Sequence, residues 1–135
     1  MILALLSSVS AALVAIFGKI GLKNVDPTMA TSLRAIIMAV AVFLLAALTG
    51  KFSGVFGLAQ SDWVWIILSG LAGAASWIFY FIALKMGDAS KVAAIDRTSI
   101  IFVVIFAIFF LGEKFTWLKL LGAIFIGAGV FLITR

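Results

Sequence analysis

Long runs of apolar residues, separated by short polar breaks, set the pattern along the chain. A bilayer core about 30 Å thick needs roughly 20 apolar residues in a helix that rises 1.5 Å per residue. About five segments of that length fit between the breaks, and we expect transmembrane helices at about 2–22, 28–49, 63–85, 91–111 and 117–134. The pattern therefore predicts an all-α integral membrane protein.

The breaks carry residue types that begin helices. Asp26 precedes Pro27, where Asp caps a helix and Pro lacks an N–H that the first turn does not use. We expect Ser61 and Asp62 to cap the third helix and Ser90 to cap the fourth. Because all connectors are short, consecutive helices should be antiparallel neighbours. We expect one compact bundle, a single transmembrane domain over residues 1–135.

Composition excludes most alternatives to a membrane protein. The chain is 66% hydrophobic and 11% charged, with a mean hydropathy of +1.36, whereas soluble domains are roughly half apolar and a quarter charged. The ten Lys and Arg residues are scattered singly, which argues against a nucleic-acid partner and for contact with the headgroups of a lipid bilayer. The sequence contains no Cys and no His. We therefore expect no enzyme activity, no metal and no cofactor.

Charged residues inside the predicted helices are the candidates for function: Lys19, Arg34, Asp96 and Arg97. Charges that persist in a span usually face a bundle interior or a water-filled path. Because successive helices alternate in direction, we expect all four charged residues to lie in one layer, about one to two turns inside their helix ends. Three bases against one acid favour an anionic or zwitterionic solute. Trp77 and Tyr80 are expected to add substrate-binding walls.

Two interpretations compete for the basic residues of this layer. Lys19 and Arg34 are long enough to snorkel back to the headgroups, which is at least as good an explanation as solute binding. Asp96 is too short to snorkel, and we expect it to pair with Arg34, Arg97 or Lys19. As the one acid well inside a span, Asp96 is our candidate counter-ion and proton site.

Two stretches of the sequence resemble the second half of an EamA domain, which defines much of the drug/metabolite transporter superfamily. They are Ile-Ala-Leu-Lys-Met-Gly-Asp-Ala-Ser at 82–90 and Phe-Leu-Gly-Glu-Lys-Phe-Thr-Trp at 110–117, followed by glycines at 122, 127 and 129. Gly18, Lys19 and Arg34 resemble the first hairpin of that family. The resemblance covers essentially the whole chain. It implies secondary transport of small molecules by alternating access, in the inner or plasma membrane.

The resemblance also has a limit. Many family members have proline near the start of the fourth helix, where this chain has Ile95, Asp96 and Arg97. No substrate can therefore be carried over from the larger, ten-helix relatives.

The resemblance also bears on assembly. Larger family members contain two such domains in inverted orientation, and secondary transporters commonly place their site between two repeats. We therefore expect a homodimer with the pathway between protomers. Basic residues of the loops and tail are split three against four between two faces, with Lys51, Lys114 and Lys119 on one and Lys23, Lys85, Lys91 and Arg135 on the other. So weak a bias leaves an antiparallel pair and dual topology open.

The alternative function is a non-transporting scaffold or assembly subunit.

Overall fold

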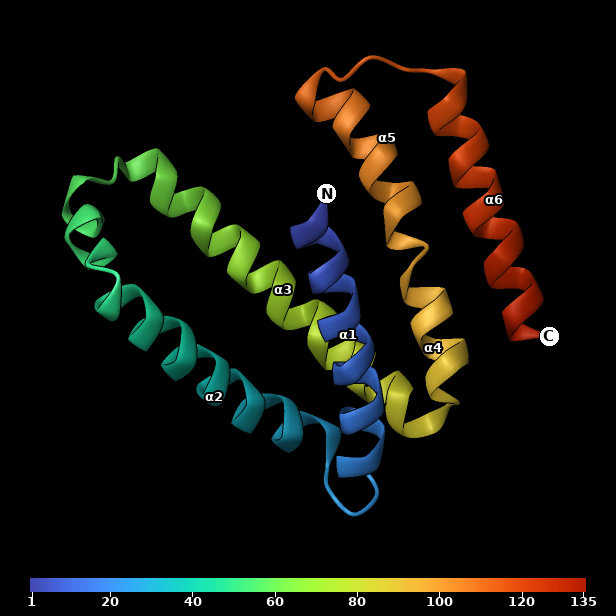
Figure 1. Cartoon of the computed structure of the whole chain (residues 1–135), viewed down its shortest axis with the longest axis horizontal. Helices are drawn as coiled ribbons and strands as arrows, with labels where there is room; N and C mark the ends of the chain where they lie inside the picture. The colour runs from blue at the N-terminus through green and yellow to red at the C-terminus, as the bar shows by residue number, and fades with distance from the viewer. The chain divides into compact units, whose positions relative to one another are not determined.

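The computed structural model describes residues 1–135 and contains helices without strands (Figure 1). The helices are α1 (Ile2–Gly21), α2 (Pro27–Leu48), the 3-10 helix η1 (Lys51–Gly57), α3 (Gln60–Met86), α4 (Ala89–Asp96), α5 (Ser99–Leu111) and α6 (Trp117–Thr134). Five segments are long and apolar enough to cross a membrane, and α4 and α5 together form one of them. The predicted all-α membrane fold with about five spans is confirmed.

The chain divides into two compact units. The first unit comprises residues 1–19 and 86–135, and so contains most of α1 together with α4, α5 and α6. The second unit comprises residues 20–85 and contains α2, η1 and α3. A single domain over residues 1–135 stays a prediction.

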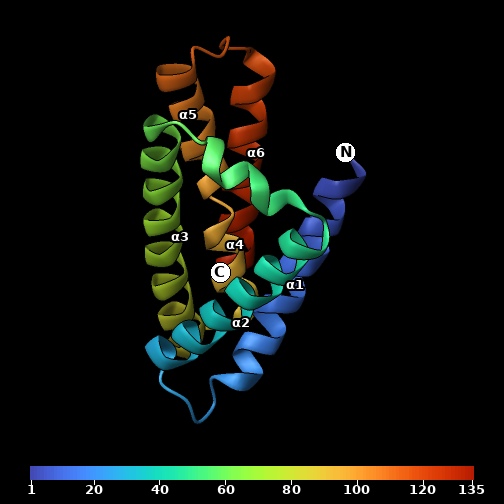
Figure 2. The ribbon, with the colours of Figure 1, turned by 90° about the vertical axis from the view of Figure 1, so that its left-hand side faces the viewer.

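In the second unit, α2 and α3 run antiparallel, converge at one end and are joined at the other by η1 (Figures 1 and 2). Asp26 caps α2 as predicted, because its Oδ1 accepts hydrogen bonds from the N–H groups of Thr28 at 2.9 Å and Met29 at 3.0 Å. Gly50 follows α2 with a φ of 67°, a left-handed conformation that glycine adopts without strain.

The core of the second unit lies where α2 and α3 converge. Its buried residues are Leu22, Thr31, Phe81 and Leu84. Nearby, the Nζ of Lys85 donates a hydrogen bond to the carbonyl of Val25 at 2.7 Å, which ties the end of α3 to the loop before α2. These contacts fix the narrow end of the α2–α3 pair, whereas the helices separate toward η1.

In the first unit, α6 packs alongside α4 and α5 (Figures 1 and 2). Small side chains are buried here, with Ala94 of α4 and Ala107 of α5 less than a tenth exposed. A Cβ placed on Gly127 of α6 would lie 3.9 Å from the Cδ1 of Ile101. Small residues thus permit close approach between helices in a solvent where no hydrophobic effect drives them together.

The predicted fourth helix, 91–111, differs from the structure because it is interrupted. The N–H of Arg97 donates to the carbonyl of Ala94 at 3.1 Å, and that of Thr98 to Ile95 at 2.9 Å, so the backbone tightens into a 3-10 turn. The hydroxyl of Thr98 also donates to the Ile95 carbonyl, at 2.7 Å. Such side-chain bonds to the preceding turn bend helices.

The start of α4 also corrects an expectation. The N-cap position is Asp88, whose side chain makes no capping bond, and Ser90 lies inside the helix. The cap expected at Ser90 is therefore wrong. The third helix begins at Gln60, and the carboxylate of Asp62 accepts a hydrogen bond from the N–H of Ala59 at 3.0 Å.

Candidate solute-binding site

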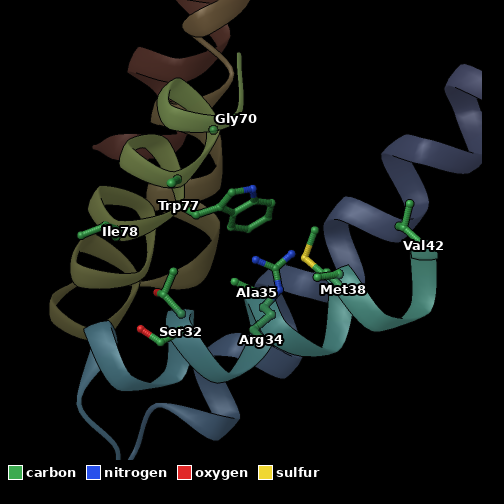
Figure 3. Close-up of a pocket in the computed structure, with 12 residues that line it drawn as sticks. Ser32, Arg34, Ala35, Met38, Val42, Gly70, Trp77 and Ile78 are labelled. Carbon is green, nitrogen blue, oxygen red and sulfur yellow. The ribbon is translucent and has the colours of Figure 1, made fainter. Parts of the chain in front are cut away.

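A pocket of about 660 Å³ lies between α2 and α3 in the second unit (Figure 3). Small-molecule sites in proteins commonly measure roughly 300–1,000 Å³. The lining comes from Thr31, Ser32, Arg34, Ala35, Met38, Ala39 and Val42 of α2 and from Gly70, Gly73, Ala74, Trp77 and Ile78 of α3. Helical spacing places these residues on facing sides of the two helices, and the small residues of α3 leave room between them.

Arg34 is the charged residue of this pocket. Its guanidinium carbon lies 3.6 Å from the centroid of the Trp77 ring and 5.3 Å from that of Phe81. A guanidinium over an aromatic face is held by the quadrupole of the ring. Figure 3 shows the Arg34 side chain crossing from α2 toward Trp77 on α3. This contact accounts for the direction of the side chain without snorkelling.

The stacking leaves the N–H donors of Arg34 available. The side chain is half-buried, and it forms no hydrogen bond or ion pair within the structure. A guanidinium presents its N–H groups in its own plane, so a ring on its face does not compete for them. Arg34 can therefore still bind a carboxylate or phosphate at its edge.

An aromatic cluster supports Trp77 in this position. The Trp77 ring centroid is 5.7 Å from that of Tyr80 and 5.8 Å from that of Phe81, both with the rings at steep angles. Tyr80, a predicted site residue, contacts Trp77 but does not line the pocket. Phe81 was missed from the sequence, although its spacing of four residues from Trp77 signals the same helix face.

The remaining predicted site residues, Lys19, Asp96 and Arg97, lie in the first unit. The Nζ of Lys19 donates a hydrogen bond to the carbonyl of Gly87 at 2.7 Å, in the turn before α4. Asp96 is half-buried at the last residue of α4, and Arg97 is exposed in the 3-10 turn that follows.

Pairing of Asp96 with a base is not observed within the first unit. The ion pair in the structure joins the Nζ of Lys119, in the first turn of α6, to the Oε2 of Glu113, in the connector before it, at 2.7 Å. Asp96 forms no ion pair with Lys19 or Arg97. The common layer of four charges, with its ion pair, stays a prediction.

The whole chain, residues 1–135, matches the EamA-like transporter family. The chain belongs to this family. A curated protein of Sinorhizobium sp. named "Uncharacterized transporter in cobO 3'region" is similar to this EamA-like protein, with 42% identity over 130 residues that cover 96% of this chain and 92% of that protein. No solved structure matches the chain.

Membership in the EamA-like family agrees with the sequence resemblance and gives the coarse function. This EamA-like protein is a multi-pass cell-membrane transporter of small molecules. Its family points to transport rather than to enzyme chemistry. The pocket between α2 and α3, which lies between two candidate membrane spans, is the candidate site for a small molecule.

Proposed function

We propose that this EamA-like protein is a secondary transporter of small anionic or zwitterionic metabolites that works by alternating access. The observation that carries the proposal is the Arg34 guanidinium, which lies 3.6 Å from the Trp77 ring in a pocket between two membrane spans. A cation held inside a span is costly unless it serves a partner or a solute path. Here its hydrogen-bond donors are available to a solute.

Alternating access also requires a segment that can change shape. The 3-10 turn at Arg97 and Thr98 interrupts the span formed by α4 and α5. Such interruptions often mark hinges, and discontinuous helices recur at transporter sites. We place the moving element of the transport cycle at this turn, with Asp96 beside it as counter-ion and proton site.

Replacing Asp96 tests that assignment. Asp96→Asn removes the charge and keeps the shape of the side chain, so we expect transport to stop while membrane insertion is unchanged. Asp88→Asn is the matched control, because Asp88 is exposed at the start of the same helix and its side chain makes no capping bond. Normal transport by Asp96→Asn across the pH range would remove Asp96 from the mechanism.

We further propose a homodimer in which both copies contribute to the pathway. One EamA-like domain supplies one structural repeat, whereas secondary transporters commonly use two. A reporter fused after Arg135 tests whether the copies are inserted in opposite directions. Signal from both compartments supports an antiparallel pair, and signal from one compartment contradicts it.

Solute uptake by the purified protein in liposomes tests the proposal as a whole. We expect saturable uptake of labelled anionic or zwitterionic metabolites, well above uptake by empty liposomes. The competing function is a scaffold or assembly subunit without transport. That function predicts uptake equal to empty liposomes for every solute of the panel.

A further inference from the structure

The lining of the α2–α3 pocket narrows the solute class, and this step rests on the proposed transport function. Arg34 is the one ionisable residue in the lining, which contains no acid. The hydroxyls of Thr31 and Ser32 already donate to the carbonyls of Pro27 at 2.7 Å and Thr28 at 2.9 Å. The pocket therefore offers a single positive charge, and its polar groups gather toward the start of α2.

The rest of the pocket is apolar. Met38 and Val42 follow Arg34 along α2 (Figure 3), and Gly70 and Ile78 of α3 also line the pocket. Because the two helices run antiparallel and separate toward η1, Val42 and Gly70 lie at the end away from the polar groups. A solute bound at Arg34 would extend its remaining atoms along this apolar face.

The single charge of the lining favours some classes of small molecule over others. A zwitterion would bring an ammonium group that finds no carboxylate in the lining, and a dianion would bring a second negative charge without a second cation. An unpaired charge away from water is strongly unfavourable. A carboxylate suits the available edge of the Arg34 guanidinium, because two parallel N–H donors match its two oxygens.

We infer that the α2–α3 pocket selects amphiphilic monoanions, which are molecules with one carboxylate or similar group on an apolar body. Arg34 binds the anionic group, Trp77 holds Arg34 in place, and the apolar face takes the body. An anionic lipid offers the same chemistry through its headgroup and first methylenes. We assign the pocket to a free solute, because its volume of about 660 Å³ is that of a small-molecule site.

Binding of a matched set of probes tests the selectivity directly. Hydrocinnamate, phenylalanine, phenethylamine and phenylsuccinate share an aromatic skeleton and differ in charge. In nanodiscs of zwitterionic lipid, we expect hydrocinnamate to bind at least about tenfold more tightly than each of the other probes. Binding of phenylalanine as tight as that of hydrocinnamate would overturn the inference.

Two substitutions, each with a control, test separately whether the pocket binds the anionic group and the apolar body of the solute. Arg34→Gln should abolish hydrocinnamate binding, whereas Arg135→Gln should not, although Arg135 also lies over a ring, 4.8 Å from the centroid of Phe131. Gly73→Leu should also block binding, because Gly73 lines the pocket and a Cβ there meets nothing within 4 Å, so the leucine side chain has room to occupy the solute's space. Gly122→Leu, equally open but in α6, is its control. Unchanged hydrocinnamate binding by Gly73→Leu would show that the apolar body of the solute does not occupy this pocket.

Two further experiments test whether the pocket binds lipid or a free solute, and whether selective binding is accompanied by transport. Adding phosphatidylglycerol to the nanodiscs should leave hydrocinnamate binding unchanged, and competition by this lipid would assign the pocket to lipid instead. Hydrocinnamate that binds in the expected order but does not enter liposomes would support the selectivity and contradict the transport function. Uptake of phenylalanine without uptake of hydrocinnamate would support the transport function and contradict the selectivity for monoanions.

Discussion

Lys19 is held by a backbone carbonyl in the first unit. Its Nζ donates to the Gly87 carbonyl at 2.7 Å, and both groups belong to the same compact unit. Hydrogen bonds from charged donors contribute more than neutral ones, and their loss leaves a polar group without its partner. The contact gives Lys19 a structural role beside the solute-binding role predicted for it.

Replacing Lys19 should therefore weaken the fold. We expect Lys19→Met to lower the free energy of unfolding in detergent by roughly 1–2 kcal/mol, since it removes one charge-assisted hydrogen bond. Denaturant titration of the purified protein measures this change. Lys23→Met is the control, because Lys23 is exposed. Equal stability of the two variants would mean that the Gly87 contact contributes nothing.

The candidate site could be predicted from the sequence only in part. Arg34 stood out because a charge inside an apolar span is unfavourable and needs a reason, and Trp77 was expected as an aromatic wall. Their contact, 3.6 Å from guanidinium to ring, depends on how α2 crosses α3, which residue spacing along one helix does not determine. Thr31, Ser32 and Met38 line the pocket without any unusual sequence feature and were missed.

At the scale of helices, two loops share a Leu-Lys-x-x-Asp pattern but differ in how their helices begin. Asp26 caps α2 with two hydrogen bonds, whereas the side chain of Asp88 makes none at the start of α4. The same residue type, in the same pattern and with nearly the same backbone conformation, thus has a different local role.

This difference predicts unequal costs of substitution. Asp26→Ala should lower the free energy of unfolding by about 1 kcal/mol, the usual cost of losing an N-cap. Asp88→Ala should change it by only a few tenths of that amount, because it removes no capping bond. Thermal unfolding of both variants in detergent measures the pair. Equal destabilisation would contradict the assignment of Asp26 as a cap.

The interruption between α4 and α5 predicts a variant that slows transport without unfolding the protein. Thr98→Ala removes the hydroxyl bond to Ile95 and should favour a straighter helix. We expect a lower maximal uptake rate with little change in apparent affinity, since the pocket lies in α2 and α3. Thr134→Ala is the control, because Thr134 makes a similar bond to Val130 at the end of α6. A normal uptake rate in Thr98→Ala would contradict the assignment of a hinge to this turn.

Helix positions were more predictable than helix continuity. The thickness of a bilayer fixes how many apolar residues a span needs, so the spans follow from length and hydropathy alone. The turn at Arg97 and Thr98 lies in a short polar stretch, 96–99, inside the fourth span and contains no proline or glycine. It arises from local hydrogen bonding that hydropathy does not record.

At the scale of the whole molecule, large apolar side chains are exposed along every span. Lipid is the solvent that such a surface requires, since no water-soluble domain leaves so much of it uncovered. The family match over residues 1–135 agrees with this character of the chain. A transporter built this way must carry its polar chemistry in a few interior positions, among which Arg34 is the one inside the described pocket.

The central claim is that small solutes cross the membrane along a path that includes Arg34. Uptake of labelled hydrocinnamate into liposomes by the wild type, Arg34→Gln and Arg135→Gln tests it most directly. We predict saturable uptake by the wild type and Arg135→Gln, and uptake no greater than that of empty liposomes by Arg34→Gln. Equal uptake by all the variants would contradict the account, because the solute would then bypass the pocket between α2 and α3.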